Sequence, residues 1–166
     1  MQLGNARESL AYWAAAKEAA KALGGRLLLG EWFAALEAES LVDAGDPVAG
    51  LRLAQEALEL SRSTESSIGE ALAERAIGRA IAAGTDRQAK ALPHIKRCLE
   101  ICQRIGARFE VVRALLAQGA ALLACGNPNE AATILAEALT MARECQLERE
   151  ESIALALMAR VNKAST

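Results

Sequence analysis

The feature that most constrains this chain is an internal repeat. A small residue followed by a leucine, a polar residue and another apolar residue recurs at 57–60, 98–101 and 138–141. A second marker, a small residue expected in the middle of the other helix of each unit, falls at Ala38, Gly78 and Gly119. Both markers return about every 40 residues, and two markers with one period predict an array of similar units.

Turn residues separate the segments of this array. They occur at Gly45-Asp46-Pro47, Gly84-Thr85-Asp86 and Gly126-Asn127-Pro128. Each places a helix-ending glycine near an Asp or Asn that can cap the next helix, and two have proline at the first helical position. Such short turns are typical of neighbouring antiparallel helices.

Apolar residues between the turns recur at helical spacing, as at Val112, Leu115, Leu116 and Gly119. We therefore expect an all-α fold of antiparallel helix pairs with about eight helices, at 5–23, 26–44, 47–63, 67–84, 87–105, 108–125, 128–145 and 148–163. The array forms one domain over 1–166, with a partial unit at 1–25, repeats at 26–66, 67–106 and 107–146, and a partial unit at 147–166. Pro93 lies inside the fifth expected helix, where it predicts a kink or a late start.

These residues resemble the tetratricopeptide repeat (TPR) family. Gly119, Gly126-Asn127, Ala131 and Ala138 match its pattern best. The period here is longer than the family's usual period of about 34 residues. It is similar to that of bacterial regulators of the maltose-activator type and of ATPase-linked or cyclase-linked regulatory proteins. The resemblance implies a right-handed superhelical α-solenoid whose concave surface binds a protein or peptide.

Composition excludes several classes of function. The formal net charge of -2 and pI near 5.6 argue against a generally basic nucleic-acid binder. No apolar run is long enough for a bilayer span, and the first residues lack a secretory pattern, so we expect a cytoplasmic protein without a membrane partner. The four cysteines (Cys98, Cys102, Cys125 and Cys145) are expected to be reduced, packed in the interior and slow to react.

The sequence contains little that could support catalysis. No phosphate-binding glycine loop or Gly-x-Ser-x-Gly motif is present, and His94 is the single histidine. His94, Cys98 and Cys102 share a helix face, but the two ends of this trio lie about 12 Å apart along the axis, too far for one zinc ion. We expect no enzyme activity, cofactor or metal.

The resemblance places one helix of each pair along the concave surface. In the family, the positions that face the groove lie three residues before and one residue after the central small residue of this helix. Here these positions are Ala35 and Glu39, Arg75 and Arg79, Leu116 and Ala120, and, in the last unit, Ala156 and Arg160. Arg113 lies near the arginines of the adjacent repeat. Arg75, Arg79 and Arg113 are thus expected to face solvent in one stretch of groove and to bind a carboxylate or acidic peptide. The alternative is that they pair with neighbours such as Glu74.

The first two helices carry most of the aromatic residues. Trp32 either fills the N-terminal end of the core or serves as an exposed binding anchor on the groove. The family's chaperone-binding members use a Lys and Asn clamp, whose asparagines are absent here.

The predicted function is a non-catalytic scaffold for protein or peptide binding, as a module of a bacterial regulatory or signalling assembly. The alternative is a structural array that forms a homodimer through its open ends. The last helix carries Ile153, Leu155, Leu157, Met158 and Val161 without a following helix in the sequence, so we expect self-association through this end or a natural continuation of the chain.

Overall fold

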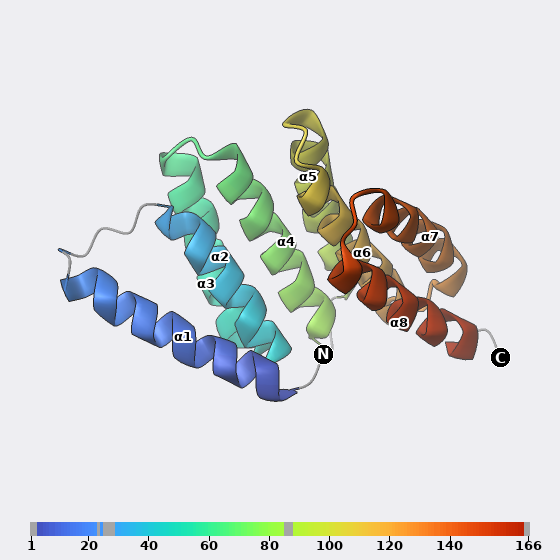
Figure 1. Cartoon of the computed structure of the whole chain (residues 1–166), viewed down its shortest axis with the longest axis horizontal. Helices are drawn as coiled ribbons and strands as arrows, with labels where there is room; N and C mark the ends of the chain where they lie inside the picture. Colours follow the sequence, from blue (N-terminus) through green and yellow to red (C-terminus); the bar gives the residue numbers. More distant parts are fainter. Residues whose placement is uncertain (1–2, 23, 25–28, 85–87, 165–166) are drawn as a thin grey trace.

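A computed structural model describes residues 3–22, 24, 29–84 and 88–164 of the chain. The described residues form eight α-helices, one 3-10 turn and no strand (Figure 1). The elements are α1 (Leu3–Ala22), α2 (Gly30–Asp43), α3 (Pro47–Ser63), α4 (Ser67–Ala83), η1 (Gln88–Lys90), α5 (Ala91–Arg104), α6 (Arg108–Ala124), α7 (Pro128–Glu144) and α8 (Glu148–Ala164). The all-α prediction is confirmed for this part of the chain.

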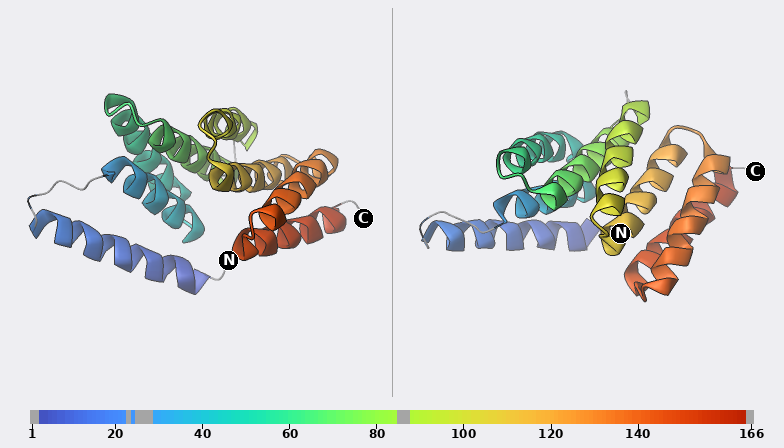
Figure 2. Two further views of the ribbon diagram at one scale, coloured as in Figure 1. Left: turned by 45° about the horizontal axis from the view of Figure 1, so that its top comes forward. Right: turned by 90° about the horizontal axis from the view of Figure 1, so that it is seen from above.

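The helices pack as a helical repeat would. Each helix contacts the next one along the chain, and α2, α4, α6 and α8 also contact one another in that order. The other helices, α3, α5 and α7, have no such mutual contacts among the described residues. The four helices of the continuous row therefore form one side of the molecule, and Figure 2 shows α1 and α8 at the two ends of an open arch.

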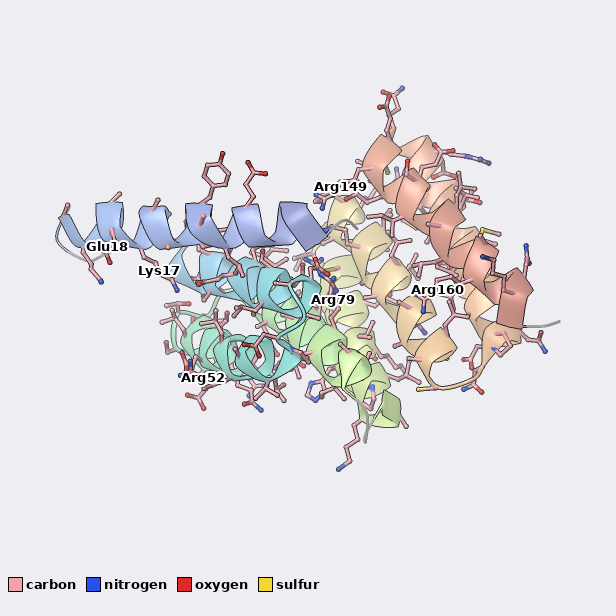
Figure 3. All side chains as sticks on the ribbon, turned by 90° about the horizontal axis from the view of Figure 1, so that it is seen from below. Lys17, Glu18, Arg52, Arg79, Arg149 and Arg160 are labelled. Carbon is pink, nitrogen blue, oxygen red and sulfur yellow. The ribbon has the colours of Figure 1, made fainter. Side chains whose placement is uncertain are left out.

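Helix α1 is attached to the array through α2 alone among the described elements. The indole nitrogen of Trp13 donates to Ser40 Oγ at 3.1 Å, and the Trp13 ring lies 5.9 Å from that of Phe33. Lys17 pairs with Glu37 at 2.6 Å, and its position on α1 is visible in Figure 3. Polar contacts and one aromatic pair thus fix α1 across α2.

Five of the turns between helices share one backbone conformation. The residue after the C-cap has a positive φ in each, at Gly45, Glu65, Gly106, Gly126 and Gln146. In every case the backbone N–H of this residue and the N–H of the next residue donate to carbonyl oxygens in the last turn of the preceding helix. This is the Schellman pattern, which satisfies carbonyl groups that have no partner within the helix. These turns follow α2, α3, α5, α6 and α7, so the repeats at 26–66 and 107–146 each consist of two similar helix-turn units.

The connection from α4 to α5 is the exception. Gly84 is extended, with φ -77°, and the predicted turn residues Thr85 and Asp86 lie outside the described residues. A 3-10 turn precedes α5, which begins at Ala91. Pro93 therefore sits in the first turn of α5, where its missing amide removes no intrahelical hydrogen bond. The predicted late start is confirmed.

The predicted helix boundaries agree with the structure to within two residues except at the start of α5, expected at 87 and observed at Ala91, and at the start of α2. The chain was expected to enter this helix at residue 26, but α2 begins at Gly30. Leu29 has φ 63°, a left-handed conformation that cannot continue a right-handed helix. Residues 26–28 of the expected helix lie outside the described residues.

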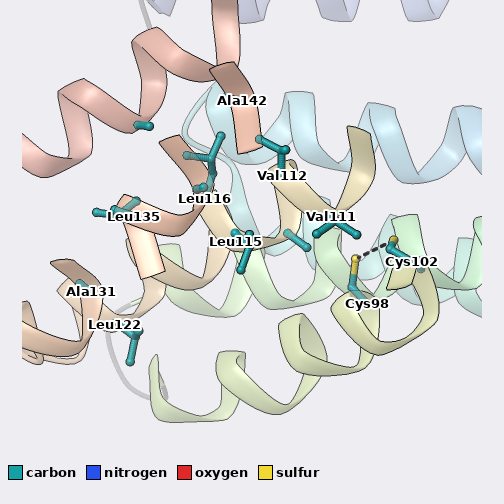
Figure 4. Packing of buried hydrophobic residues seen from close by; sticks show 14 of the residues in the cluster. Cys98, Cys102, Val111, Val112, Leu115, Leu116, Leu122, Ala131, Leu135 and Ala142 are labelled. Carbon is teal, nitrogen blue, oxygen red and sulfur yellow. Dashed lines mark hydrogen bonds between the residues drawn. The ribbon is translucent and has the colours of Figure 1, made fainter. Parts of the chain in front are cut away.

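The central small residues let neighbouring helices approach closely. A Cβ atom at Gly119 would lie 2.6 Å from Cγ of Leu135, which is fully buried on α7. Gly78 would meet Ile95 of α5 in the same way. Figure 4 shows how the side chains of α5, α6 and α7 fill this part of the core around Leu115 and Leu135.

We expect Gly119→Ala to lower the free energy of unfolding by about 1–3 kcal/mol, because the added methyl group overpacks the contact with Leu135. Urea denaturation measures this change. Gly84→Ala is the matched control, since a Cβ there meets nothing closer than 3.4 Å. Equal stability of the two variants would show that the close approach is unimportant.

The cysteines occupy two kinds of position. Cys98 and Cys102 are fully buried on α5, with their sulfur atoms 3.9 Å apart. Cys125 and Cys145 are the C-cap residues of α6 and α7 and are only half-buried. The prediction that all four are packed in the interior is therefore wrong for Cys125 and Cys145, because the chain leaves the helix at these residues.

A thiol reagent should modify Cys125 and Cys145 well before Cys98 and Cys102 in the native protein. Contact with Cys102 and burial both raise the pKa of the Cys98 thiol, which suppresses the reactive thiolate. Peptide mass spectrometry over a labelling time course distinguishes the four sites, and labelling in urea gives the unfolded reference. A single common rate in native buffer would contradict this placement.

The apolar residues of α8 are mostly used within the chain. Val161 is buried, and Ile153, Leu157 and Met158 pack against the core cluster. Leu155 is 47% exposed. Of the large apolar residues that were expected to be open on the last helix, Leu155 is the one that is exposed.

Candidate functional site

A cleft of about 530 Å³ lies along the continuous row of helices. Side chains from α1, α2, α4, α6 and α8 line it, so it reaches from one end of the arch to the other. The charged lining residues are Glu39, Asp43, Arg75, Arg79, Arg113, Arg149, Glu150 and Arg160, and the larger apolar ones are Trp13, Leu36, Leu116, Ile153 and Leu157.

The floor of the cleft contains a buried ion-pair network centred on Arg75. Its Nε donates to Glu39 Oε1 at 2.7 Å, and its Nη1 donates to Glu110 Oε2. Only 1% of the Arg75 side chain is exposed. One guanidinium on α4 therefore connects carboxylates from α2 and α6.

Two partly exposed arginines complete this network. Arg79 donates to Asp43 Oδ1 at 2.6 Å and lies 3.2 Å from Glu39 Oε2. Arg113 approaches Glu39 at 3.7 Å and Glu110 at 3.8 Å. The side chains of Arg79 and Arg113 are 26% and 23% exposed, so both can also contact a molecule in the cleft.

The network changes the proton affinity of its members. Burial raises the pKa of Glu39, but the charges of Arg75, Arg79 and Arg113 and the hydrogen bond from Arg75 outweigh it and lower the pKa to about 2. Burial also disfavours charged Arg75, yet Glu39 and Glu110 raise its pKa above the ordinary value. For Arg113, burial and the charge of Arg75 lower the pKa. Glu39 and Arg75 are therefore ionised throughout the neutral range.

The repeat explains how these residues meet. Glu39 and Asp43 are one helical turn apart on α2, and Arg75 and Arg79 are one turn apart on α4. Each pair is joined across the helices at a sequence separation of 36. Glu39 also lies 3.2 Å from Arg79 at a separation of 40, the repeat period, so its carboxylate reaches two successive turns of α4. Both ion pairs form in the same alignment.

The prediction that Arg75 faces solvent is wrong. The three arginines do lie together, as the sequence indicated, but their carboxylate partners make Arg75 an interior residue. Glu74 is not their partner, because it contacts His94 at 2.6 Å and Arg62 at 3.5 Å. Glu39 reaches Arg75 as well as Arg79 at the equivalent position of the next repeat, and alignment of equivalent positions alone does not reveal the contact with Arg75.

Trp32 does not line the cleft. Its indole nitrogen donates to Ser66 Oγ at 3.2 Å, and its ring packs against the core cluster of α2, α3 and α4. The interpretation of Trp32 as core is therefore correct, and the groove anchor is wrong. Trp13 of α1 is the aromatic residue that lines the cleft instead.

The other predicted groove residues are mostly found there. Glu39, Leu116, Ala120, Ala156 and Arg160 all line the cleft, whereas Ala35 is buried outside its lining. Sequence reasoning missed Arg149, although it lies eleven positions before Arg160 and therefore on the same face of α8. It also missed the carboxylates of Asp43 and Glu150.

His94 and the two cysteines considered for a metal site contact different partners in the structure. His94 Nδ1 contacts Glu74, whereas Cys98 contacts Cys102 in the core. No group of three or more potential metal ligands occurs among the described residues.

Comparison with known proteins adds no family to this geometry. No protein-family model matches the chain, and a search of curated proteins finds no match either. Within the part of the chain that the structure describes, every helix is too short or too polar to cross a membrane.

We expect Glu39→Gln to lower the free energy of unfolding at pH 7 by about 3–5 kcal/mol, since it leaves buried Arg75 short of a counter-charge. The folded-state pKa of Glu39, about 2, is lower than the ordinary 4.5. Its stabilising charge is therefore fully present above pH 4.5 and is lost as the pH falls through 2. The difference between wild type and variant should shrink over this range.

Urea denaturation from pH 7 to pH 2 provides the measurement. Glu137→Gln on exposed α7 is the control with the same chemical change, because Glu137 makes no ion pair among the described residues. A wild-type advantage over Glu39→Gln that is independent of pH would contradict this account of the network.

Proposed function

We propose that this chain is a non-catalytic scaffold that binds a protein or peptide in the cleft along α2, α4, α6 and α8. In this proposal the helix pairs run antiparallel and stack as a right-handed TPR-like solenoid. The chain would serve in a bacterial regulatory or signalling assembly in the cytoplasm. The observation that carries the proposal is the cleft itself, which draws its lining from every helix of the row and from α1.

The size and shape of the cleft support a macromolecular ligand. Stacked repeats expose extended concave surfaces, which such folds use for recognition. A row of four helices presents alternating small and charged side chains, including Ala117, Ala120 and Ala156, that leave room for a polypeptide segment. The cleft extends over several repeats, as a peptide site requires.

The chemistry of the cleft supports binding in preference to catalysis. The Glu39 carboxylate is held ionised by three arginines, which keep its pKa near 2, so it is a poor proton donor at neutral pH. His94 is outside the cleft lining and is bonded to Glu74. The charged groups at the floor are therefore ion-paired with one another, and none of them is suited to transfer a proton at neutral pH.

The homodimer is the second candidate, and Leu155 favours it. Leu155 is 47% exposed on α8 at the end of the array, where a second copy could cover it. The neighbouring apolar residues of α8 are already packed within the chain, which leaves a small apolar contact for this interface.

A photo-crosslinking amino acid placed at Ala120 or Ala156 should capture one defined polypeptide, because both positions line the cleft. The same amino acid at Glu59 of α3 or Glu137 of α7, which are exposed outside the cleft, should capture none of it. Gel analysis and mass spectrometry of the crosslinked species give the readout.

Capture of the same polypeptide mainly from Glu59 or Glu137 would contradict binding in the cleft. Capture of a second copy of this chain, with a doubled mass in light scattering, would favour the homodimer.

A further inference from the structure

We propose that the ligand of the cleft is an acidic segment of a partner protein, held by Arg149 and Arg160 of α8 and packed against the apolar side chains between them. This inference rests on the proposed function and specifies its ligand.

The accessible positive charge of the cleft lies on α8. Arg75, Arg79 and Arg113 are matched by Glu39, Asp43 and Glu110. Arg149 and Arg160 are exposed and make no ion pair with any described residue. These two arginines are therefore available for an external carboxylate.

Charge across the whole cleft points to the same ligand. Five arginines and three carboxylates line it, and Glu110, which pairs with Arg75, adds a fourth carboxylate, so one positive charge remains in excess although the chain as a whole has a net charge of -2. The positive excess is thus local to the cleft. Such a local potential attracts acidic ligands and suppresses basic ones.

The spacing along α8 defines the shape of the ligand. Arg149 and Arg160 are eleven positions apart, which is about three helical turns or roughly 16 Å on one face. Figure 3 shows them toward opposite ends of α8, with Arg79 on α4. Acidic groups at this distance are about five residues apart in an extended peptide and about eleven apart in a helix.

The surface between the two arginines is apolar. Ile153, Ala156 and Leu157 line the cleft on α8, and Leu116 and Ala120 line it on α6. Aliphatic side chains of the ligand can bury area here while its carboxylates contact the arginines. The cleft therefore fits a segment in which acidic residues flank an apolar centre.

The floor offers one further donor. Nη2 of Arg75 is buried and has no hydrogen-bond partner among the described residues. A buried donor without an acceptor costs free energy, and a carboxylate that reached the floor between Arg79 and Arg113 would lower this cost.

A nucleic acid fits this cleft less well than an acidic peptide. Glu39, Asp43 and Glu150 also line the cleft and would repel a continuous phosphate backbone. Binding of single strands commonly uses several aromatic stacking platforms, and Trp13 is the one aromatic side chain in the described lining. Discrete carboxylates separated by aliphatic groups match the mixed lining better.

Two labelled synthetic peptides of equal length test the proposal by fluorescence anisotropy. One has glutamates eleven positions apart with leucine and alanine between them, and the other has glutamine in place of each glutamate. The glutamate peptide should bind at least tenfold more tightly than the glutamine peptide at low salt, and higher salt should weaken it.

Arg149→Glu and Arg160→Glu should each weaken binding of the glutamate peptide by about two- to fivefold, the range for an exposed charge pair. Arg104→Glu is the matched control, because Arg104 is exposed on α5 outside the cleft. Circular dichroism and melting temperature should be unchanged in all three variants, since none of these side chains is buried.

Equal affinity for the two peptides, no binding at millimolar peptide, or an equal effect of Arg104→Glu would overturn the proposal. Stronger competition by oligodeoxythymidine than by the unlabelled glutamate peptide would overturn it in favour of a nucleic acid. A partner captured from Ala120 that binds Arg149→Glu and Arg160→Glu as well as wild type would leave the scaffold function standing and remove the acidic ligand.

Discussion

The buried contact of Arg75 with Glu39 and Glu110 is the interaction on which the arrangement of the row depends. A guanidinium with 1% of its side chain exposed is costly in a protein interior unless carboxylates surround it. Because the two carboxylates come from α2 and α6, the charge on α4 is compensated only when three consecutive helices of the row are in place. A slip by one turn would separate Arg75 from Glu39 and Arg79 from Asp43 together.

Close packing and repeated turns, together with the ion pairs, determine how the helices are arranged. Ion pairs define the alignment of α2, α4 and α6, whereas small residues such as Gly78 and Gly119 let the helices on the other side approach. The Schellman turns recur at the ends of α2, α3, α5, α6 and α7 and satisfy the last carbonyl groups of these helices. The α4–α5 connection departs from this rule, and Pro93 then marks the first turn of α5.

The sequence predicted the parts of this structure that depend on local chemistry. Glycine turns at Gly45 and Gly126 and the bounds of α3 follow from residues close together in the chain. The turns at Glu65 and Gln146 were expected at the right places, but their positive φ was not predictable, because neither residue is the usual glycine. The burial of Arg75 was also missed, since it depends on contacts with Glu39 and Glu110 from two other helices, which no local pattern shows.

The same residue type therefore has two physical roles in one cleft. Arg75 is surrounded by carboxylates of its own chain, and its charge stabilises the alignment of the helices. Arg149 and Arg160 lie on the last helix of the row without such partners among the described residues, so a change in either has little effect on the interior. A repeat array built in this way can change the charges of its last helix, and with them its ligand, while the buried network that aligns the repeats stays intact.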